Sequence, residues 1–116
     1  MKGNKTKKNK KEIENRTHKI VNEALVSISN ITRVEITKYI REHKKVTFEE
    51  LRTVFNLNNN TLCFHLRKLQ DAYIISQPKQ RGPYELGELG KLMLNIREEL
   101  EIKAIPILVQ EIINNE

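Results

Sequence analysis

The feature that most constrains the fold of this chain is the spacing of three leucines in its middle third. Leu62, Leu66 and Leu69 stand at positions i, i+4 and i+7, so on a helix they lie on one face. Asn58 precedes them, and its short polar side chain is a good N-cap because it can accept from the first backbone N–H groups of a helix. The sequence therefore predicts an amphipathic helix over about residues 59–71 whose leucine face is buried.

A second, shorter helix is predicted just upstream, over residues 47–55. Thr47 and Glu50 have the spacing of a capping box, and Leu51 begins its apolar side. Two short helices joined by a turn of about three to four residues make a helix-turn-helix. In that motif the second helix enters the major groove of DNA with its N-terminal end first. The pair of helices therefore predicts a DNA-binding unit.

Apolar periodicity predicts three further helices around this pair. They run over about residues 12–29, 31–43 and 88–103, the second capped by Ser29 or Asn30. Pro106 cannot donate a backbone hydrogen bond, so the last helix is expected to kink or restart there. On the last helix the residues expected to face inward are Leu89, Leu92, Met93, Ile96 and Leu100.

Between the helix pair and the last helix, the pattern changes from helical to β. Residues 73–78 are rich in strand formers, residues 79–83 indicate a turn, and residues 84–86 close a hairpin. Val46 is expected to form a strand of one or two residues. A short hairpin with a basic tip directly after such a helix is a wing. The expected fold is therefore mainly α with a small β-hairpin wing over about residues 73–86, a winged helix-turn-helix.

The net charge of +6 is unevenly distributed along the chain. Residues 1–19 hold eight Lys/Arg and two Glu, whereas residues 20–116 hold 13 Lys/Arg and 13 Asp/Glu. Residues 1–11 contain no large apolar side chain after Met1, so we predict a disordered basic tail followed by one domain over residues 12–116. The tail is either a solubilising segment or an arm that contacts phosphates or a minor groove.

Composition favours a soluble protein of the cytoplasm, associated with the nucleoid. The single cysteine cannot form an intrachain disulfide, and no apolar run approaches the ~20 residues that span a bilayer. No apolar stretch follows the basic N-terminus at signal-peptide distance, so no membrane partner is expected. The sequence holds no nucleophile–base pair, glycine-rich phosphate loop or paired-carboxylate motif. We therefore expect neither enzymatic activity nor a cofactor.

The terminal helices carry more apolar surface than a small monomer can cover. Residues 105–113 are apolar on more than one side, and exposed they would leave a large apolar area in water. We therefore predict that the N-terminal and C-terminal helices form the interface of a homodimer. The residues assigned to this interface are Ile13, Ile20, Leu25, Met93, Ile96, Leu100, Ile105, Leu108 and Ile112.

The predicted DNA contacts follow from the same geometry. Asparagine can pair bidentately with adenine, and arginine can donate to a base edge or a phosphate. Phe64 is expected on the exposed face, where it either contacts thymine methyl groups or packs under the wing. Each position also has an ordinary structural role as a cap, a surface ion pair or part of a solvated hairpin. The predicted DNA-binding residues are Thr47, Asn59, Asn60, Thr61, Phe64, Arg67, Lys68, Lys79, Gln80 and Arg81.

Cys63 and the histidines invite chemical interpretations that we weighed against structural ones. A thiol exposed beside DNA would be a redox switch, whereas a lone cysteine is more commonly a small filler residue. His18, His43 and His65 are far apart in sequence, and with one cysteine they do not make a closed zinc site. His65 falls toward the leucine face, so we expect a hydrogen-bonded structural histidine rather than a catalytic base.

The order of the elements and several segments resemble the ArsR-type winged-helix regulators. The resemblance covers about residues 31–93 and includes the His65–Leu66 pair of that family's recognition helix. In overall character the chain is similar to small archaeal winged-helix proteins. The resembling segments are Arg33–Ile36, Thr47–Leu51, Leu57–Leu69 and Tyr84–Gly90.

The resemblance implies a homodimer that binds pseudo-palindromic double-stranded DNA through paired recognition helices and wings. Metal-sensing members carry a Cys-x-Cys pair or Asp/His sets that this chain lacks, so no metal is implied. Whether a small-molecule effector binds is left open. Asn56 and Tyr73 stand where the family commonly has glycine. A left-handed cap at Tyr73 would cost about 1 kcal/mol or more, so we expect the helix to end differently there.

The charge distribution leaves an alternative open. Because residues 20–116 are neutral overall, the fold could instead serve as an architectural module on chromatin, or as a docking module for another protein. That alternative predicts little sequence preference, and DNA binding that disappears with residues 1–11.

Overall fold

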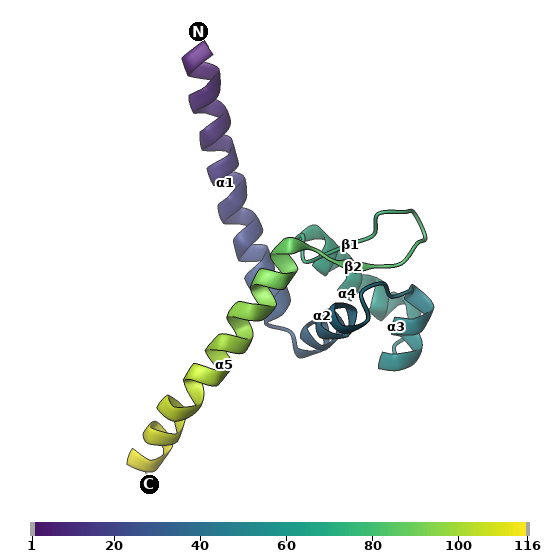
Figure 1. The fold of residues 1–116 in the computed structure, drawn as a ribbon, viewed down its shortest axis with the longest axis vertical. Helices are drawn as coiled ribbons and strands as arrows, with labels where there is room; N and C mark the ends of the chain where they lie inside the picture. The colour runs from purple at the N-terminus through teal and green to yellow at the C-terminus, as the bar shows by residue number, and fades with distance from the viewer. Residues whose placement is uncertain (1, 116) are drawn as a thin grey trace.

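The computed structural model describes residues 2–115 as five helices and one antiparallel hairpin (Figure 1). Met1 and Glu116 lie outside the described residues, as do the side chains of residues 2–8. The chain is mainly α with a small two-stranded hairpin, as its sequence predicts, and this is consistent with a winged-helix-like fold. The elements are α1 (Lys2–Ile28), α2 (Ile31–His43), α3 (Phe48–Phe55), α4 (Asn59–Asp71), β1 (Ile75–Ser76), β2 (Glu85–Leu86) and α5 (Glu88–Asn114).

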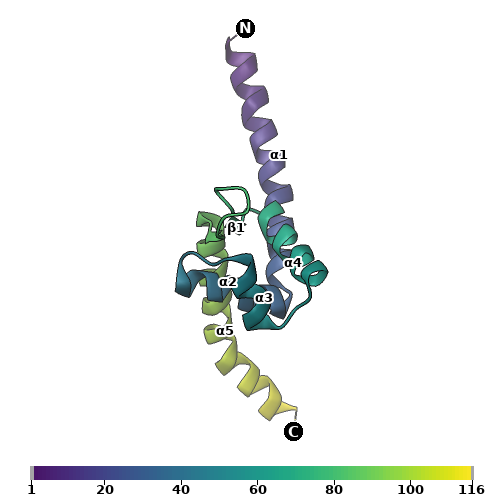
Figure 2. The ribbon, with the colours of Figure 1, turned by 90° about the vertical axis from the view of Figure 1, so that its right-hand side faces the viewer.

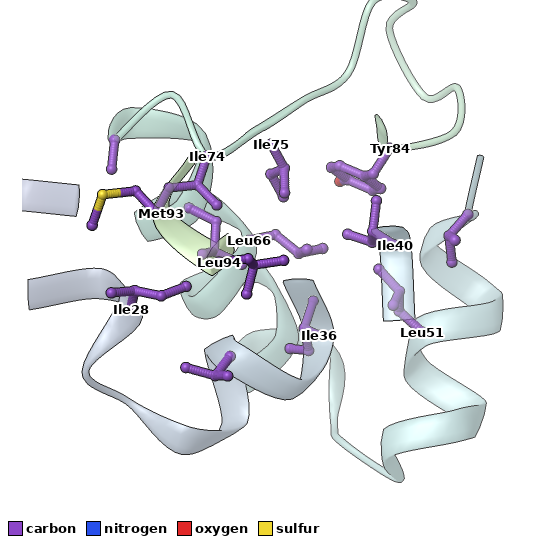
Figure 3. Close-up of a cluster of buried hydrophobic side chains, with 14 of the residues drawn as sticks. Ile28, Ile36, Ile40, Leu51, Leu66, Ile74, Ile75, Tyr84, Met93 and Leu94 are labelled. Atoms are coloured by element: carbon purple, nitrogen blue, oxygen red, sulfur yellow. The ribbon is translucent and has the colours of Figure 1, made fainter. Parts of the chain in front are cut away.

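The hydrophobic core lies where the end of α1, helices α2 and α4, the hairpin and the start of α5 meet (Figure 3). Ile36 and Ile40 of α2 are fully buried at its centre. The predicted leucine face of α4 is buried as well, since Leu62, Leu66 and Leu69 are at most 2% exposed. Burying each such side chain stabilises the fold by about 1.5–3 kcal/mol. The leucine spacing is therefore sufficient to decide which face of α4 points inward.

Side-chain caps determine where α2, α3 and α4 begin. Asn30, Thr47 and Asn58 each accept a hydrogen bond from the backbone N–H three residues later, at 3.1, 3.1 and 2.8 Å. Such a cap stabilises a helix by about 1 kcal/mol. The predicted caps are therefore confirmed. In a complete capping box the Glu50 carboxylate would also accept from the Thr47 N–H. Here it accepts instead from the Tyr39 hydroxyl, at 2.6 Å.

The hairpin is short and is extended by one further bridge. Its two strands pair antiparallel with Ile75 opposite Leu86. Val46 forms an isolated bridge to Tyr84, with N···O distances of 3.1 and 2.7 Å, so the predicted strand residue is confirmed. The side chains of Ile75 and Tyr84 are buried in the core, which holds the base of the hairpin against α2 and α4 (Figure 3).

Helix α4 ends in a left-handed turn at Tyr73, which has a φ of 62°. The Tyr73 N–H donates to the Gln70 carbonyl at 3.0 Å, and the Ile74 N–H donates to the Leu69 carbonyl at 2.9 Å. These two bonds make a Schellman cap, and the fully buried Leu69 and Ile74 side chains hold it in place. Our expectation of a different helix end is therefore wrong. Asn56 adopts the left-handed conformation at the end of α3.

The strain at this cap can be measured by comparing two substitutions. We expect Tyr73→Gly to be more stable than Tyr73→Ala by about 1 kcal/mol, because only alanine keeps a Cβ in the left-handed region. The Tyr73 side chain is 54% exposed, so both variants lose similar packing. Urea denaturation measures the difference, although the greater freedom of unfolded glycine offsets part of it. Equal stabilities would contradict the prediction.

The two terminal helices extend away from the body of the protein (Figures 1 and 2). The radius of gyration is 18.0 Å, whereas a compact chain of this length would have about 13 Å. Helix α1 reaches Lys2, so residues 2–11, predicted as a disordered tail, are helical in this structure. Helix α5 continues through Pro106, so the restart that we considered there does not occur, although its C-terminal half changes direction in Figure 2. None of the helices within residues 2–115 has the length and apolarity that a membrane crossing requires.

Helix α5 reaches the core through its first turns. Met93 and Leu94 are buried there, at 5% and 0% exposure (Figure 3). Our assignment of Met93 to the dimer interface is therefore wrong, because the side chain is already covered by its own chain. Leu92, Ile96 and Leu100, which we expected to face inward, are 52%, 48% and 66% exposed. The apolar spacing identified residues that share a helix, but it did not show how far the core extends along that helix.

Candidate nucleic-acid interface

Helices α3 and α4 form a two-helix unit joined by a hydrogen-bonded turn. The backbone N–H groups of Asn56 and Leu57 donate to carbonyl groups in the last turns of α3, each at 3.3 Å. Leu57 packs against the core, and Asn58 then caps α4. The predicted arrangement of helix, turn and helix is therefore present, and it holds α4 in a defined position relative to α3.

The outer face of α4 presents most of the residues that we predicted to contact DNA. Asn59, Asn60, Arg67 and Lys68 are exposed, and Thr61 is half-buried. The first turn of a helix also has unpaired backbone N–H groups and the positive end of the helix dipole, which together favour an anion. The outer face thus combines amide groups that can read a base edge with cations and N–H groups that can bind phosphate.

Phe64 lies on the same outer face and is 55% exposed. Its ring lies 5.6 Å from the Lys68 ammonium and meets the His65 ring edge-on, with 5.8 Å between ring centroids. Of the two positions that we considered, the exposed one fits better than packing beneath the hairpin. Phe64 therefore gives an otherwise polar surface one apolar contact.

Cys63 is an exposed free thiol on α4. Burial, and then the Cys63 thiol, raise the pKa of Tyr84 at the base of the hairpin. The exposed position of Cys63 is compatible with both a redox role and a plain surface role. In the part of the chain that the structure describes, no three or more His, Cys, Asp or Glu side chains gather as a metal site would require.

The turn between β1 and β2 presents a second set of predicted contacts. Lys79, Gln80 and Arg81 are all exposed. The Gly82 N–H donates to the Lys79 carbonyl at 2.8 Å, and the Gln77 side chain donates to the Gly82 carbonyl at 2.9 Å. These two hydrogen bonds fix the backbone of the turn that carries the exposed Lys79 and Arg81 side chains. The turn projects to the same side of the body as α3 (Figure 1).

Thr47 is the predicted contact with the most evident structural role. It is exposed at the start of α3, but its hydroxyl oxygen already accepts from the Glu50 N–H. The hydroxyl hydrogen remains able to donate, so a contact with a phosphate is still chemically feasible.

Behind the outer face, His65 connects α4 to α2. The Arg33 Nη1 atom lies 3.3 Å from His65 Nδ1, and Arg33 Nε donates to the Ser27 carbonyl at 2.9 Å. Burial, and then the Arg33 charge, lower the pKa of His65. The prediction of a hydrogen-bonded structural histidine is therefore confirmed. Sequence reasoning missed Arg33, although its place four and seven residues before the buried Thr37 and Ile40 indicated an inward position.

Two arginine contacts fix the first half of α5 to the body. The Arg41 guanidinium on α2 pairs with both oxygens of the Glu98 carboxylate. The hydrogen bond from Arg41 lowers the pKa of Glu98. Arg97 Nη1 donates to the Ile28 carbonyl at the end of α1, at 2.9 Å. The beginning of α5 is therefore attached to both α1 and α2.

Beyond these contacts, the terminal helices expose large apolar side chains. Ile20 is half-buried, and the other predicted interface residues, apart from the buried Met93, are between 48% and 66% exposed. Apolar patches of this kind are larger than the scattered exposed side chains of an ordinary monomer. Further exposed apolar residues toward the end of α5 are Ile102, Ile107, Val109 and Ile113.

Across residues 2–115, these features make the protein mainly helical with a small antiparallel hairpin, which is consistent with a winged-helix-like fold. Neither the protein-family models nor the curated proteins give a match to the chain. Among solved structures, it is similar to a protein of Pseudomonas aeruginosa PA01 described as a "putative transcriptional regulator protein". The two share 22% identity with a TM-score of 0.53, over 84% of this chain and 73% of the other. At this identity the likeness supports the fold alone.

Proposed function

We propose that this chain is a DNA-binding transcriptional regulator of ArsR-like type, without metal-sensing ligands, that acts as a homodimer. Its role is binding rather than catalysis. Helix α4 enters the major groove, and the hairpin lies on the flanking backbone as a wing. The observation that carries the proposal is the orientation of α4, whose leucine face is buried while Asn59, Asn60, Arg67 and Lys68 point outward. The fold likeness to a protein described as a transcriptional regulator supports it.

The proposed contacts divide into two chemical classes. Asn60 and Arg67 read base edges, since an amide matches adenine and a guanidinium matches guanine. Lys68, Lys79 and Arg81 bind phosphates, which orient the protein without carrying sequence information. Helix α4 supplies the specificity in this proposal, while the hairpin supplies affinity.

A homodimer would supply the second recognition helix. The exposed apolar faces of α1 and α5 support such an interface, because water contact at Leu25, Ile105 and Leu108 is unfavourable. In a two-fold symmetric dimer the same surface of both copies meets, and the two α4 helices address half-sites about one DNA turn apart. The preferred site is therefore expected to be pseudo-palindromic.

The proposal can be tested by measuring which DNA sequences Arg67 helps to recognise. Arg67→Ala is expected to weaken binding to a selected preferred site by about 1–3 kcal/mol, and to weaken binding to random duplex much less. Fluorescence anisotropy over a salt series measures both affinities. Lys91→Ala is the matched control, because it removes one exposed positive charge from α5, outside the proposed interface. Equal losses on both DNAs would argue against base recognition by Arg67.

The charge distribution favours one second candidate, a module that binds DNA without sequence preference or docks another protein. The positive charge lies in residues 1–19, of which residues 2–19 belong to α1, while residues 20–116 are neutral overall. That candidate predicts similar affinity for selected and random duplexes, and loss of both when residues 1–11 are deleted. A sequence preference that survives the deletion would exclude it.

A further inference from the structure

We propose that Arg33 is a positioning residue for the recognition helix, and that it acts through the unprotonated Nδ1 atom of His65. The proposal rests on the DNA-binding role of α4 proposed above. It adds a polar link between the end of α1 and α4, in which Arg33 and His65 are not among the predicted DNA contacts and Lys68 takes part only through its backbone carbonyl.

The link consists of two paths that both start at Ser27, which is 3% exposed. In the first, the Ser27 carbonyl accepts from Arg33 Nε at 2.9 Å, and Arg33 Nη1 reaches His65 Nδ1 at 3.3 Å. In the second, the Ser27 hydroxyl donates to the Lys68 carbonyl at 3.3 Å. His65 and Lys68 lie one turn apart on α4. The end of α1 is thus hydrogen-bonded to the middle of the helix whose outer face is proposed to read DNA.

The direction of the His65 bond fixes its protonation state. Arginine carries only donors, so Arg33 donates and His65 Nδ1 must be the acceptor, which places the imidazole proton on Nε2. Arg33 is 9% exposed, and the structure gives this buried cation two neutral acceptors, the Ser27 carbonyl and His65. Removing either acceptor would leave buried N–H groups unsatisfied, at considerable cost.

The groups around His65 offer little compensation for a second positive charge. Arg33 faces it from α2, Lys68 and Phe64 lie beside it on α4, and α1 contributes the neutral Ser27. From α5, the Arg97 guanidinium binds the neighbouring Ile28 carbonyl. Carboxylates also line the recess beside Ser27 and Lys68. The pKa of His65 is lowered by burial and then by the Arg33 charge. The two recess carboxylates are Glu23 and Asp71.

Protonation of His65 would therefore break the link. A protonated Nδ1 cannot accept, and it would face the Arg33 guanidinium as a like charge. Helix α4 would then lose the Arg33–His65 attachment and keep the hydrogen bond from Ser27 to the Lys68 carbonyl. Protonation of His65 could act on DNA affinity through its charge or through the position of α4, and these two effects have opposite signs. An added charge near the phosphates would raise affinity, whereas a misaligned recognition helix would lower it.

The test compares DNA binding at about pH 7.5 and about pH 5, across the range in which histidine titrates. Wild-type protein is expected to lose about tenfold in affinity for its preferred site on acidification. His65→Asn places an amide oxygen close to the position of Nδ1 and cannot titrate, so its affinity is expected to change less than about twofold. The control His18→Asn removes an exposed histidine of α1 and is expected to behave as wild type. A wild-type affinity that rises on acidification, or identical profiles for wild type and His65→Asn, would overturn the proposal.

Arg33→Lys provides a second variant that keeps the charge but cannot bridge two acceptors in the same fork geometry. At about pH 7.5 it is expected to have the weaker affinity that wild type shows at acid pH, and acidification should then change it little. Circular dichroism verifies that the variant is folded. Wild-type affinity together with a wild-type pH profile in Arg33→Lys would refute the positioning role.

The pH dependence of unfolding provides a readout that needs no DNA. The pKa of His65 is lowered in the folded state, so its stabilising contribution is fully present above about pH 6.5 and is lost as pH falls below that value. His65→Asn is expected to lose less stability than wild type over the same range. If this difference appears but no DNA binding is found, the link stands and the proposed function fails. If wild type and His65→Asn lose stability equally, the link itself is refuted.

Discussion

Replacing Leu108 and Ile112 together by glutamate is expected to convert a dimer into a folded monomer. These residues are 55% and 59% exposed on α5, so the substitutions remove almost nothing from the chain's own core. In a two-fold symmetric interface each position occurs twice. Burying each such side chain contributes about 1.5 kcal/mol or more, so the double variant should lose about 6 kcal/mol of association energy. That loss corresponds to a dissociation constant about 10⁴-fold higher.

Sedimentation equilibrium of wild type and variant measures this change directly. The matched control is Gln110→Glu combined with Asn114→Asp, which adds the same two charges at exposed polar positions of the same helix. The control is expected to remain dimeric, and circular dichroism should show native helix content in both variants. If the glutamate variant is still a dimer, the interface lies elsewhere. A wild-type chain that is already monomeric would remove the homodimer from the proposed function.

Loss of the dimer should also change DNA binding in a specific way. A monomer brings one α4 helix to one half-site, so the energy from the second half-site is lost. Affinity for a full site is then expected to fall to that for an isolated half-site, while Arg67 still discriminates between bases within it. The dimer variant and Arg67→Ala therefore test different parts of the proposal.

Local signals in the sequence were sufficient to predict the central helices. Helix α2 and helix α4 lie where the periodicity placed them, and the caps at Thr47 and Asn58 form the expected hydrogen bonds. These features depend on residues within about one turn of each other, where side-chain chemistry acts directly on the backbone. A strand of one or two residues was also predicted at Val46, and the structure has a single-residue bridge there.

The errors concern features that depend on distant parts of the chain. Met93 and Ile96 are both apolar and three residues apart, yet one is buried and the other is 48% exposed. Which of them is covered depends on where the body ends along α5, and a sequence period carries no such information. At Tyr73, the burial of Leu69 and Ile74 outweighs the local cost of a left-handed residue.

The Arg33–His65 link shows the same limit for the candidate site. The two residues are 32 positions apart; the sequence suggested a structural role for His65 and none for Arg33. Periodicity can indicate that Arg33 faces inward, but the identity of its partners requires the packing of α1, α2 and α4. The outer face of α4, by contrast, could be predicted, since it is simply opposite to the leucine face.

A single methyl group at Gly90 is expected to cause one of the largest losses of stability in this chain. A Cβ atom there would lie 2.1 Å from the Ile74 carbonyl oxygen and 2.7 Å from the Leu86 side chain. The Ile74 carbonyl cannot move away easily, because it also accepts from the Gly87 N–H at 2.9 Å. Gly90→Ala should therefore lower the free energy of unfolding by about 3 kcal/mol, the upper end of the overpacking range. That loss would occur although alanine normally favours a helix by about 1 kcal/mol over glycine.

Chemical denaturation of Gly90→Ala beside Asn95→Ala tests this prediction. Asn95 is exposed on the same helix, so its variant should stay within about 0.5 kcal/mol of wild type. A Gly90→Ala protein as stable as wild type would mean that α5 does not cross the turn as closely as described. The contact also has a functional consequence, because Ile74 belongs to the cap that ends α4. Glycine at position 90 thus lets the proposed dimer helix rest directly on the end of the proposed recognition helix. A variant that folds with α5 displaced should therefore bind full-site DNA more weakly while remaining a dimer.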